Sequence, residues 1–311
     1  MPIIVRDRIE GPRSSPVTKG RSSVSSILRL LRPHQWLKNI LVLLPVLLAH
    51  QWKNYGVVRD AVLATACFCA TASAVYITND LLDLEADRNH ASKRLRLLAA
   101  GAVSSSTAVI VTIVLLLLAL VLALRLPIAF GGTVLIYFTV SSLYSLYFKT
   151  KAILDICILA GLYTIRLFAG GAATHIRISE WTLAFAMFCF LGLAAVKRYT
   201  ELQMLPGDPK QLLRRGYERT DQITVHILGM TSMMLSVLVL ALYLHSPEVT
   251  VLYRHPEMLW LICPVLLYWY GRVWIVAGRG KMHADPIVFA IRDPVSLLAA
   301  VVILVIGLLC K

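Results

Sequence analysis

The sequence predicts an all-α integral membrane protein with nine transmembrane helices. Two features of the composition indicate this class: 58% of the 311 residues are hydrophobic and only 15% are charged, whereas a soluble domain usually carries about 25% charged residues. The third observation is that the apolar residues gather in runs. Most of these runs approach the roughly 20 residues that a helix needs to cross the hydrocarbon core of a bilayer.

The chain divides into a tail and one transmembrane domain. Residues 1–36 are polar, basic and rich in Ser and Pro, without the apolar segment of a signal peptide, and are predicted to form a disordered cytoplasmic tail. Residues 37–311 form the predicted nine-helix domain. The first apolar run is short, and Arg292, Asp293 and Pro294 interrupt the ninth. The nine runs are residues 37–51, 57–78, 107–126, 128–148, 153–172, 181–196, 223–245, 258–277 and 287–310.

The distribution of Lys and Arg predicts the orientation of the chain. Alternate loops between the runs hold fourteen of these residues, and the opposite loops hold five. Because cytoplasmic loops carry the excess of positive charge, the N-terminus is predicted to be cytoplasmic, as in a bacterial-type inner (plasma) membrane. The net charge of +14 then reflects topology and anionic ligands, and nucleic acid is not an expected partner.

The six cysteines all fall inside apolar runs and have no CxxC spacing. The sequence therefore supports neither a disulfide framework nor a zinc site, and the cysteines are interpreted as packing residues.

Acidic residues gather where the second apolar run ends, in the stretch NDLLDLEADRNH. If residues 79–88 continue that helix, steps of about 100° per residue place Asn79, Asp80, Asp83 and Asp87 on one face. Three carboxylates on one face repel one another unless a cation lies among them. Carboxylate oxygens with water and phosphate oxygens are the ligands of Mg²⁺, so the motif predicts a magnesium site; the alternative is a solvated helix end.

A basic cluster follows the acidic motif directly. Cationic side chains can stabilise a pyrophosphate as it leaves, although ordinary positive-inside bias also explains single residues of the cluster. The candidate phosphate ligands are Arg88, His90, Lys93, Arg94 and Arg96.

These motifs resemble those of the UbiA superfamily of intramembrane prenyltransferases, whose fold has nine transmembrane helices. The resemblance rests on Asn79-Asp80-x-x-Asp83-x-x-x-Asp87 and spans nearly the whole chain after the tail. The stretches RPHQWLKN, HASKRLRLLAAG, YSLYFK, DICILAGLYTIRLFAGG and KRYTEL are similar to the branch that forms polyprenyl-phosphate phosphoribose. That branch moves phosphoribose from phosphoribosyl pyrophosphate to a polyprenyl phosphate, such as decaprenyl phosphate, with Mg²⁺.

The sequence departs from the superfamily pattern at two places. The second aspartate-rich motif expected after the sixth helix is replaced by KRYTELQMLPGD, with Glu201 as the nearest equivalent, which favours the phosphoribose branch. Ala91 and Leu97 stand where that branch usually has prolines, which affects the path of the loop more than the chemistry.

The resemblance implies a catalytic and metal-binding group of Asn79, Asp80, Asp83 and Asp87 at the cytoplasmic face. It also implies further substrate-binding residues outside the acidic motif. For Lys38 the alternative is a lysine that extends to the membrane interface beside Trp36, and for Lys197 it is an i,i+4 pair with Glu201. Asp155 and Arg166 lie inside the fifth run, where ionisable residues line a cavity or meet a partner. The implied residues are Lys38, Asn39, Tyr144, Lys149, Asp155, Arg166, Lys197, Arg198, Glu201 and Tyr217.

Three functions remain open from the sequence. The leading one is transfer of phosphoribose to a polyprenyl phosphate, as a precursor of lipid-linked arabinose or ribose donors for glycan synthesis. The second is Mg²⁺-dependent transfer of a prenyl group from a prenyl pyrophosphate to an aromatic or lipid acceptor. The third is a transporter or lipid-binding protein, which would place its ionisable groups near the middle of the bilayer. Prenyl chain length is not specified, and a homo-oligomer stays open.

Overall fold

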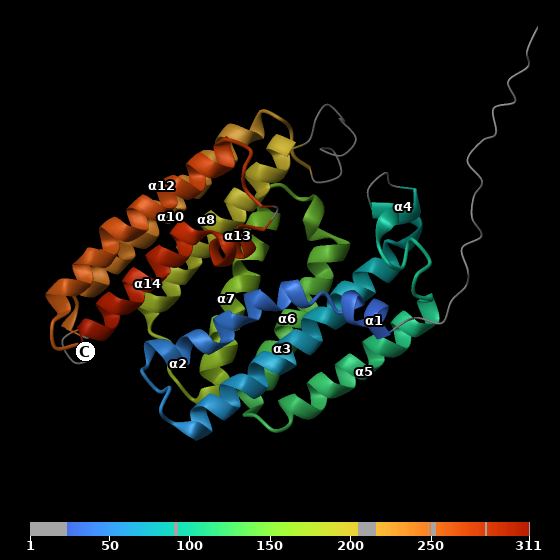
Figure 1. Cartoon of the computed structure of the whole chain (residues 1–311), viewed down its shortest axis with the longest axis horizontal. Helices are drawn as coiled ribbons and strands as arrows, with labels where there is room; N and C mark the ends of the chain where they lie inside the picture. Colours follow the sequence, from blue (N-terminus) through green and yellow to red (C-terminus); the bar gives the residue numbers. More distant parts are fainter. Residues whose placement is uncertain are drawn as a thin grey trace, which may run out of the picture.

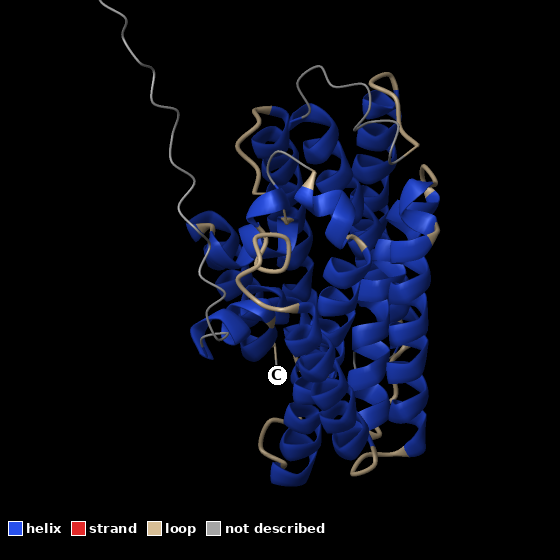
Figure 2. Ribbon diagram, turned by 90° about the vertical axis from the view of Figure 1, so that its right-hand side faces the viewer, coloured by secondary structure: helices blue, strands red, loops and turns tan. Residues whose placement is uncertain are grey.

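In the computed structural model, long helices lie side by side in one bundle (Figure 1). The structure describes residues 24–89, 93–204, 216–247, 249, 253–283 and 285–310. Within these residues there are helices and loops but no strand (Figure 2), as expected for a chain that must satisfy its backbone hydrogen bonds inside a membrane. The all-α prediction is confirmed for the described part of the chain.

The order of the elements follows the apolar runs. In chain order they are α1 (Val24–Leu30), η1 (Pro33–Leu43), α2 (Leu44–Leu48), α3 (Tyr55–Leu82), α4 (Leu84–Arg88), η2 (Lys93–Leu95), α5 (Ser105–Ala123), α6 (Ile128–Leu146), η3 (Phe148–Thr150), α7 (Leu154–Thr174), α8 (Glu180–Met204), α10 (Asp221–Leu244), η4 (Pro256–Leu261), α12 (Ile262–Gly278), α13 (Pro286–Arg292) and α14 (Pro294–Leu309).

The predicted count of nine transmembrane helices is not confirmed. Among the described residues, seven helical segments are long and apolar enough to cross a membrane, and an eighth span results if α13 and α14 count together. These two helices meet at an angle of 78°, at Asp293 and Pro294. Since Pro cannot donate a backbone hydrogen bond and the Asp293 side chain caps α14, the ninth run folds as a broken pair.

The first apolar run differs most from its prediction. It forms the 3₁₀ segment η1 and the short helix α2 in place of one spanning α-helix. Pro33 and Pro45 stand at the starts of these two elements, where the missing N–H is tolerated. Helix α1 begins at Val24, within the predicted tail of residues 1–36; residues 1–23 lie outside the described residues.

Small residues allow the first segment to lie against the bundle. A Cβ atom added to Gly170 of α7 would lie 2.1 Å from the carbonyl oxygen of Val42 and 3.0 Å from the Pro45 side chain. Because such contacts leave no room for a side chain, Gly170 is required for η1 and α2 to cross α7 at backbone distance. The segment that carries Lys38 and Asn39 is thereby fixed against α7.

Two large apolar cores hold the long helices together, and a smaller third one packs Leu30 of α1 against α3 and α5. One large core joins α7, α8, α10, α12 and α14 around Phe190, Met233 and Tyr270, and the other joins α3, α5, α6 and α7 around Phe68 and Phe130. In Figure 1 these groups occupy opposite sides of the bundle, with α7 between them. The end of α3, the end of α6 and the beginning of α7 consequently meet at one end of the bundle, where the acidic motif lies.

Candidate functional site

The acidic motif lines a cavity of about 380 Å³ at the end of α3. Asp83 is the C-cap of α3, and its carbonyl oxygen accepts from the Asp87 amide at 2.8 Å, so α4 continues α3 with only a slight break. The predicted common face is confirmed, because all four residues of the motif border this space, called here the acidic cavity. Its lining is Arg32, Tyr76, Asn79, Asp80, Asp83, Ala86, Asp87, Lys93, Arg96, Ser145, Lys149 and Thr150.

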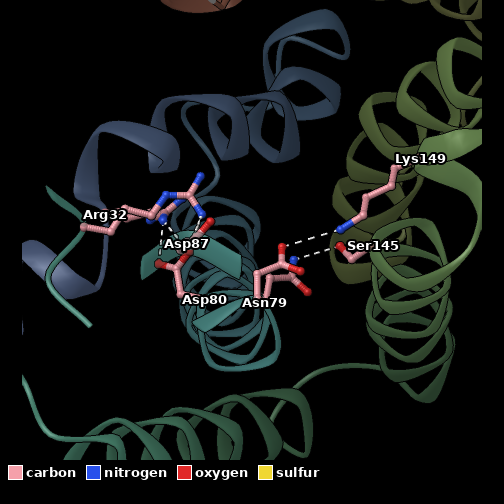
Figure 3. A network of polar contacts seen from close by, with 8 residues as sticks. Arg32, Asn79, Asp80, Asp87, Ser145 and Lys149 are labelled. Atoms are coloured by element: carbon pink, nitrogen blue, oxygen red, sulfur yellow. Dashed lines mark hydrogen bonds and ion pairs between the residues drawn. The ribbon is translucent and has the colours of Figure 1, made fainter. Parts of the chain in front are cut away.

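Two arginines neutralise two of the aspartates. The Arg32 guanidinium donates to both carboxylate oxygens of Asp80, at 2.7 and 2.5 Å. Arg96 donates to Asp87 at 2.6 Å and to Asp80 at 3.2 Å, and so bridges them. The two guanidinium groups therefore offset the charges of Asp80 and Asp87 in this structure. Figure 3 shows Arg32 directed at Asp80, near Asp87.

Asp83 contacts neither arginine in the structure and faces Lys149 instead. Its carboxylate is 3.5 Å from the ammonium group of Lys149, and its side chain is 42% exposed. Asn79 donates to the Ser145 hydroxyl at 2.8 Å, which joins α3 to α6 (Figure 3). Asp83 is thus the most accessible carboxylate of the motif, while Asp80 and Asp87 are buried.

A second cavity of about 200 Å³ adjoins the first and is called the inner cavity. Tyr76, Asn79 and Ser145 border both. From these shared residues the inner cavity reaches about one helical turn further along α3, to Val75, and about two turns along α6, to Tyr137. It is lined by Lys38, Val75, Tyr76, Asn79, Tyr137, Ser141, Tyr144, Ser145, Leu159, Leu162, Tyr163, Arg166 and Lys197.

Three cationic side chains border the inner cavity: Lys38, Arg166 and Lys197. Arg166 is held from two sides, because its Nε donates to the Asn39 amide oxygen at 2.9 Å and its Nη2 donates to the Tyr137 hydroxyl at 3.1 Å. Asn39 is completely buried. Its amide nitrogen donates to the Cys69 thiol at 3.3 Å, so with its oxygen on Arg166 it orients the guanidinium from behind the cavity wall.

Lys38 pairs with Asp285, which caps the beginning of α13 through the Ile287 amide. Burial alone would raise the pKa of Asp285, but the charge of Lys38, followed by that of Lys197, lowers it below the ordinary value. Sequence reasoning missed the contact between Asp285 and Lys38. The two residues are far apart in the chain, and an Asp before Pro signals only a helix cap.

Another ionic cluster, called here the sealed cluster, lies near the same end of the bundle. It consists of Asp155, Arg198, Glu201 and Tyr217. Arg198 of α8 pairs with Asp155 of α7 and with Glu201. Tyr217 donates to Asp155 at 2.5 Å and accepts from the Ile153 amide at 2.8 Å, and burial followed by the Asp155 contact raises the pKa of Tyr217 above its ordinary value. The exposure of Asp155, Arg198 and Tyr217 is 0, 1 and 2%, and none of them lines either cavity.

The structure therefore divides the predicted site residues into four groups. The acidic motif, Lys93, Arg96 and Lys149 share the acidic cavity, and Lys38, Tyr144, Arg166 and Lys197 share the inner one. The sealed cluster and Asn39 contact neither cavity. Arg88 and Arg94 are exposed and do not line these cavities, and His90 lies outside the described residues. Arg32, which lines the acidic cavity, was missed because 48 residues separate it from Asp80.

The donor set of the acidic cavity suits a magnesium ion that is shared with a phosphate ligand. In the part of the chain that the structure describes, no three His, Cys, Asp or Glu side chains form a ready metal cage. Mg²⁺ needs only one or two protein carboxylates when substrate phosphates and waters supply the other oxygens. Asp83 is accessible for this, and Asp80 and Asp87 become available once their arginines turn away.

Comparisons with known proteins agree with the helical fold. The family model described as the UbiA prenyltransferase family matches residues 40–291. A solved structure, a UbiA homolog from Archaeoglobus fulgidus bound to GPP and Mg²⁺, is similar over 92% of this chain and 99% of its own, with a TM-score of 0.66 and 18% identity. At that identity the likeness shows the shared fold.

Three curated relatives are 33–37% identical to the chain. The protein y4nM of Sinorhizobium fredii matches 86% of this chain, which spans about half (52%) of that relative's length. Nodulation protein NoeC of Azorhizobium caulinodans matches 86% of this chain over 87% of its own length. The decaprenyl-phosphate phosphoribosyltransferase of Mycolicibacterium smegmatis is 37% identical over 59% of each chain.

Proposed function

The chain belongs to the UbiA prenyltransferase family, and within this family we propose that it transfers 5-phosphoribose from phosphoribosyl pyrophosphate to a polyprenyl phosphate such as decaprenyl phosphate. The products are polyprenylphosphoryl-5-phosphoribose and pyrophosphate. This lipid would serve as a precursor of lipid-linked arabinose or ribose donors for glycan synthesis.

The observation that carries the proposal is the cationic lining of the inner cavity beside the acidic one. Phosphoribosyl pyrophosphate has a pyrophosphate at one end of the ribose and a 5′-phosphate at the other, so it needs two separate anion sites. The acidic cavity offers Lys93, Arg96 and Lys149, and the inner cavity offers Lys38, Arg166 and Lys197. A prenyl pyrophosphate has only one charged end and would leave the second group of cations without a phosphate.

The metal belongs to the acidic cavity in this proposal. Asp83, with Asp80 and Asp87, would hold Mg²⁺, and Asn79 borders the same space. Bound there, Mg²⁺ would neutralise charge on the pyrophosphate as it leaves. The Archaeoglobus fulgidus homolog was solved with GPP and Mg²⁺ bound, which supports a metal in this fold.

The side chains of the two cavities would act by positioning and charge. Lys149 and Arg96 bind oxygens of the departing pyrophosphate, and Arg166, held by Asn39 and Tyr137, binds the 5′-phosphate. The bond between the anomeric carbon and pyrophosphate breaks, and an oxygen of the polyprenyl phosphate forms the new bond. Because that oxygen is already anionic, no general base is required, and rate enhancement comes from orientation and electrostatic stabilisation.

One of the relatives supports phosphoribosyl pyrophosphate as the donor. The Mycolicibacterium smegmatis relative carries the name decaprenyl-phosphate phosphoribosyltransferase at 37% identity. The end of α8 also favours this branch, because Glu201 is the only acid in the stretch KRYTEL and is engaged by Arg198. A second aspartate cluster for a prenyl pyrophosphate would have been expected at that position.

A prenyl pyrophosphate donor is the second candidate function. The family description favours it, and so do the uncharged hydroxyl, aromatic and leucine side chains that share the inner cavity with its cations. In that reaction a prenyl group would pass to an aromatic or lipid acceptor with the same release of pyrophosphate.

A donor-choice assay separates the two functions. Purified protein is incubated with Mg²⁺ and either labelled phosphoribosyl pyrophosphate plus decaprenyl phosphate or labelled geranyl pyrophosphate plus an aromatic acceptor. We expect label to enter the lipid phase as phosphoribosyl lipid only from the first donor, with loss of product on adding EDTA or in Asp83→Asn. Product from geranyl pyrophosphate alone would overturn the proposed donor.

A further inference from the structure

The arginines on the acidic motif occupy the positions that the proposed metal would need. Arg32 uses both carboxylate oxygens of Asp80, and Arg96 spans Asp80 and Asp87. A carboxylate oxygen directed at a guanidinium N–H cannot direct the same lone pair at a metal ion. Metal binding to these two aspartates therefore requires that the arginines leave them.

The arginines have room to leave, whereas the aspartates do not. The side chains of Arg32 and Arg96 are 25% and 33% exposed, but those of Asp80 and Asp87 are 9% and 4% exposed. Both arginines border the acidic cavity. A modest rotation of either guanidinium would thus keep it in contact with a ligand in the same cavity.

Arg32 is also placed by unusual backbone geometry. Its φ and ψ angles of 54° and 58° lie in the left-handed region, which is sterically strained for a non-glycine residue. The residue precedes Pro33, which disfavours an ordinary helical conformation before it, and its guanidinium lies 5.5 Å from the Tyr76 ring centroid. The fold accepts this strain and thereby holds a cation at the mouth of the acidic motif.

We propose that Arg32 and Arg96 are exchangeable counter-ions of the acidic motif. Without ligand they neutralise Asp80 and Asp87; when a metal-bound pyrophosphate group enters, the aspartates pass to the metal and the guanidiniums pass to phosphate oxygens. Guanidinium binds carboxylate and phosphate with the same paired N–H geometry, so both states satisfy it. The exchange rests on the proposed function, in which the acidic cavity receives such a group, and adds Arg32 to its binding residues.

The exchange predicts effects of opposite sign, which a simple binding role does not. Removing Arg32 frees Asp80, so metal alone should bind more tightly while metal with pyrophosphate binds more weakly. Removing the charge of Asp80 frees the arginines, so pyrophosphate without metal should bind more tightly. If Arg32 served only as a phosphate ligand or only as a structural ion pair, two affinities would fall or stay unchanged. These are the affinity of the Arg32 variant for metal alone and that of the Asp80 variant for pyrophosphate without metal.

The test measures binding of Mn²⁺ and of inorganic pyrophosphate to detergent-purified full-length protein. Free Mn²⁺ is followed by its paramagnetic resonance signal, and pyrophosphate binding in EDTA is followed by calorimetry. For Arg32→Gln and Arg96→Gln we expect Mn²⁺ alone to bind about five- to tenfold more tightly than in the wild type, a usual size for coupling between ligands. For Asp80→Asn we expect a similar gain for metal-free pyrophosphate.

Arg59 and Asp60 provide matched controls. They form the same kind of ion pair, with Arg59 Nε 2.9 Å from Asp60, but at the opposite end of α3. Arg59→Gln and Asp60→Asn should leave both affinities at the wild-type value, and melting curves in detergent identify any variant that unfolds. Two arginine variants keep the test usable if one of them is unstable.

Unchanged or weaker Mn²⁺ binding in both folded arginine variants would overturn the exchange, whichever donor the transfer assay identifies. Opposite-sign effects with inorganic pyrophosphate support it even if phosphoribosyl pyrophosphate proves not to be the donor. Failure of the exchange and failure of the proposed donor can therefore be told apart.

Discussion

Two clusters of aspartate and arginine lie near one end of the bundle and differ in exposure. Around the acidic cavity, Arg32 and Arg96 reach buried aspartates from partly exposed positions. In the sealed cluster, Arg198 and Asp155 are almost completely buried, with Tyr217 bound to the same aspartate. The same residue types can therefore serve ligand binding in one place and hold helices together in the other.

The exposure of its charged side chains decides whether a cluster can bind a ligand or only hold helices together. A charge in contact with a cavity can exchange its partner for a ligand without being left unpaired. A fully buried charge cannot, because losing its partner costs several kcal/mol. We therefore interpret the sealed cluster as a clamp that joins α7, α8 and the segment around Tyr217. Its members were predicted as substrate ligands, and a role of this indirect kind is our proposal for them.

The largest expected effect is on turnover in the acidic cavity. Asp83→Asn or Asp87→Asn should lower the rate of lipid product formation by about 100-fold or more, the usual scale for losing a group that stabilises developing charge. Both variants should remain folded, as judged by gel filtration in detergent. Near-normal Mg²⁺-dependent turnover in both would remove the acidic motif from the site.

The next effect concerns stability in the sealed cluster. Arg198→Leu leaves Asp155 buried without its cation and should lower the free energy of unfolding by roughly 3–5 kcal/mol. The measurement is the thermal midpoint in detergent, compared with Arg96→Gln, whose partners Asp80 and Asp87 line the acidic cavity. Equal midpoints for the two variants would contradict the distinction between the clusters.

A smaller effect is expected from the cations of the inner cavity. Lys197→Met should raise the concentration of phosphoribosyl pyrophosphate for half-maximal rate about tenfold, as one charge-assisted hydrogen bond is worth about 1.5–3 kcal/mol. Lys38→Met should act similarly, but it also leaves Asp285 unpaired, so its melting midpoint must be compared. The polyprenyl phosphate requirement should change less, and an equal rise for both substrates would argue against a donor-specific role.

The last prediction concerns the side of the membrane on which the cavities open, and it is tested by labelling without an activity measurement. Phosphoribosyl pyrophosphate is a cytosolic compound, so the proposed donor requires an acidic cavity that faces the cytoplasm. In a Cys157→Ser background, Arg177→Cys should react with a membrane-impermeant maleimide in intact cells, and Lys151→Cys should not. The opposite labelling pattern would place the site outside the cell and exclude the proposed donor.

Sequence patterns predicted the features that depend on neighbouring residues. The helical repeat was enough to place Asn79, Asp80, Asp83 and Asp87 on one face, and apolar runs located most of the long helices. The first run is an exception, because Pro33 and Pro45 divide it into η1 and α2. Hydropathy averages over such prolines and therefore predicts one helix there.

Partner choice between distant segments could not be predicted in this way. Arg32 pairs with Asp80 across 48 residues, and Lys38 pairs with Asp285 from the opposite end of the chain. Arg166 and Asp155 share a helix, yet one borders a cavity and the other is sealed. These outcomes depend on how η1 crosses α7 at Gly170, which no local pattern specifies.

The most direct test compares one residue from each cluster for binding of the donor. Equilibrium binding of labelled phosphoribosyl pyrophosphate with Mg²⁺ is measured for Asp83→Asn and Tyr217→Phe, together with their melting midpoints. We predict that Asp83→Asn loses about tenfold or more in affinity, equal to about 1.4 kcal/mol, with an unchanged midpoint. Tyr217→Phe should keep its affinity and melt at a lower temperature. The reverse pattern would contradict the assignment of the acidic cavity to the donor.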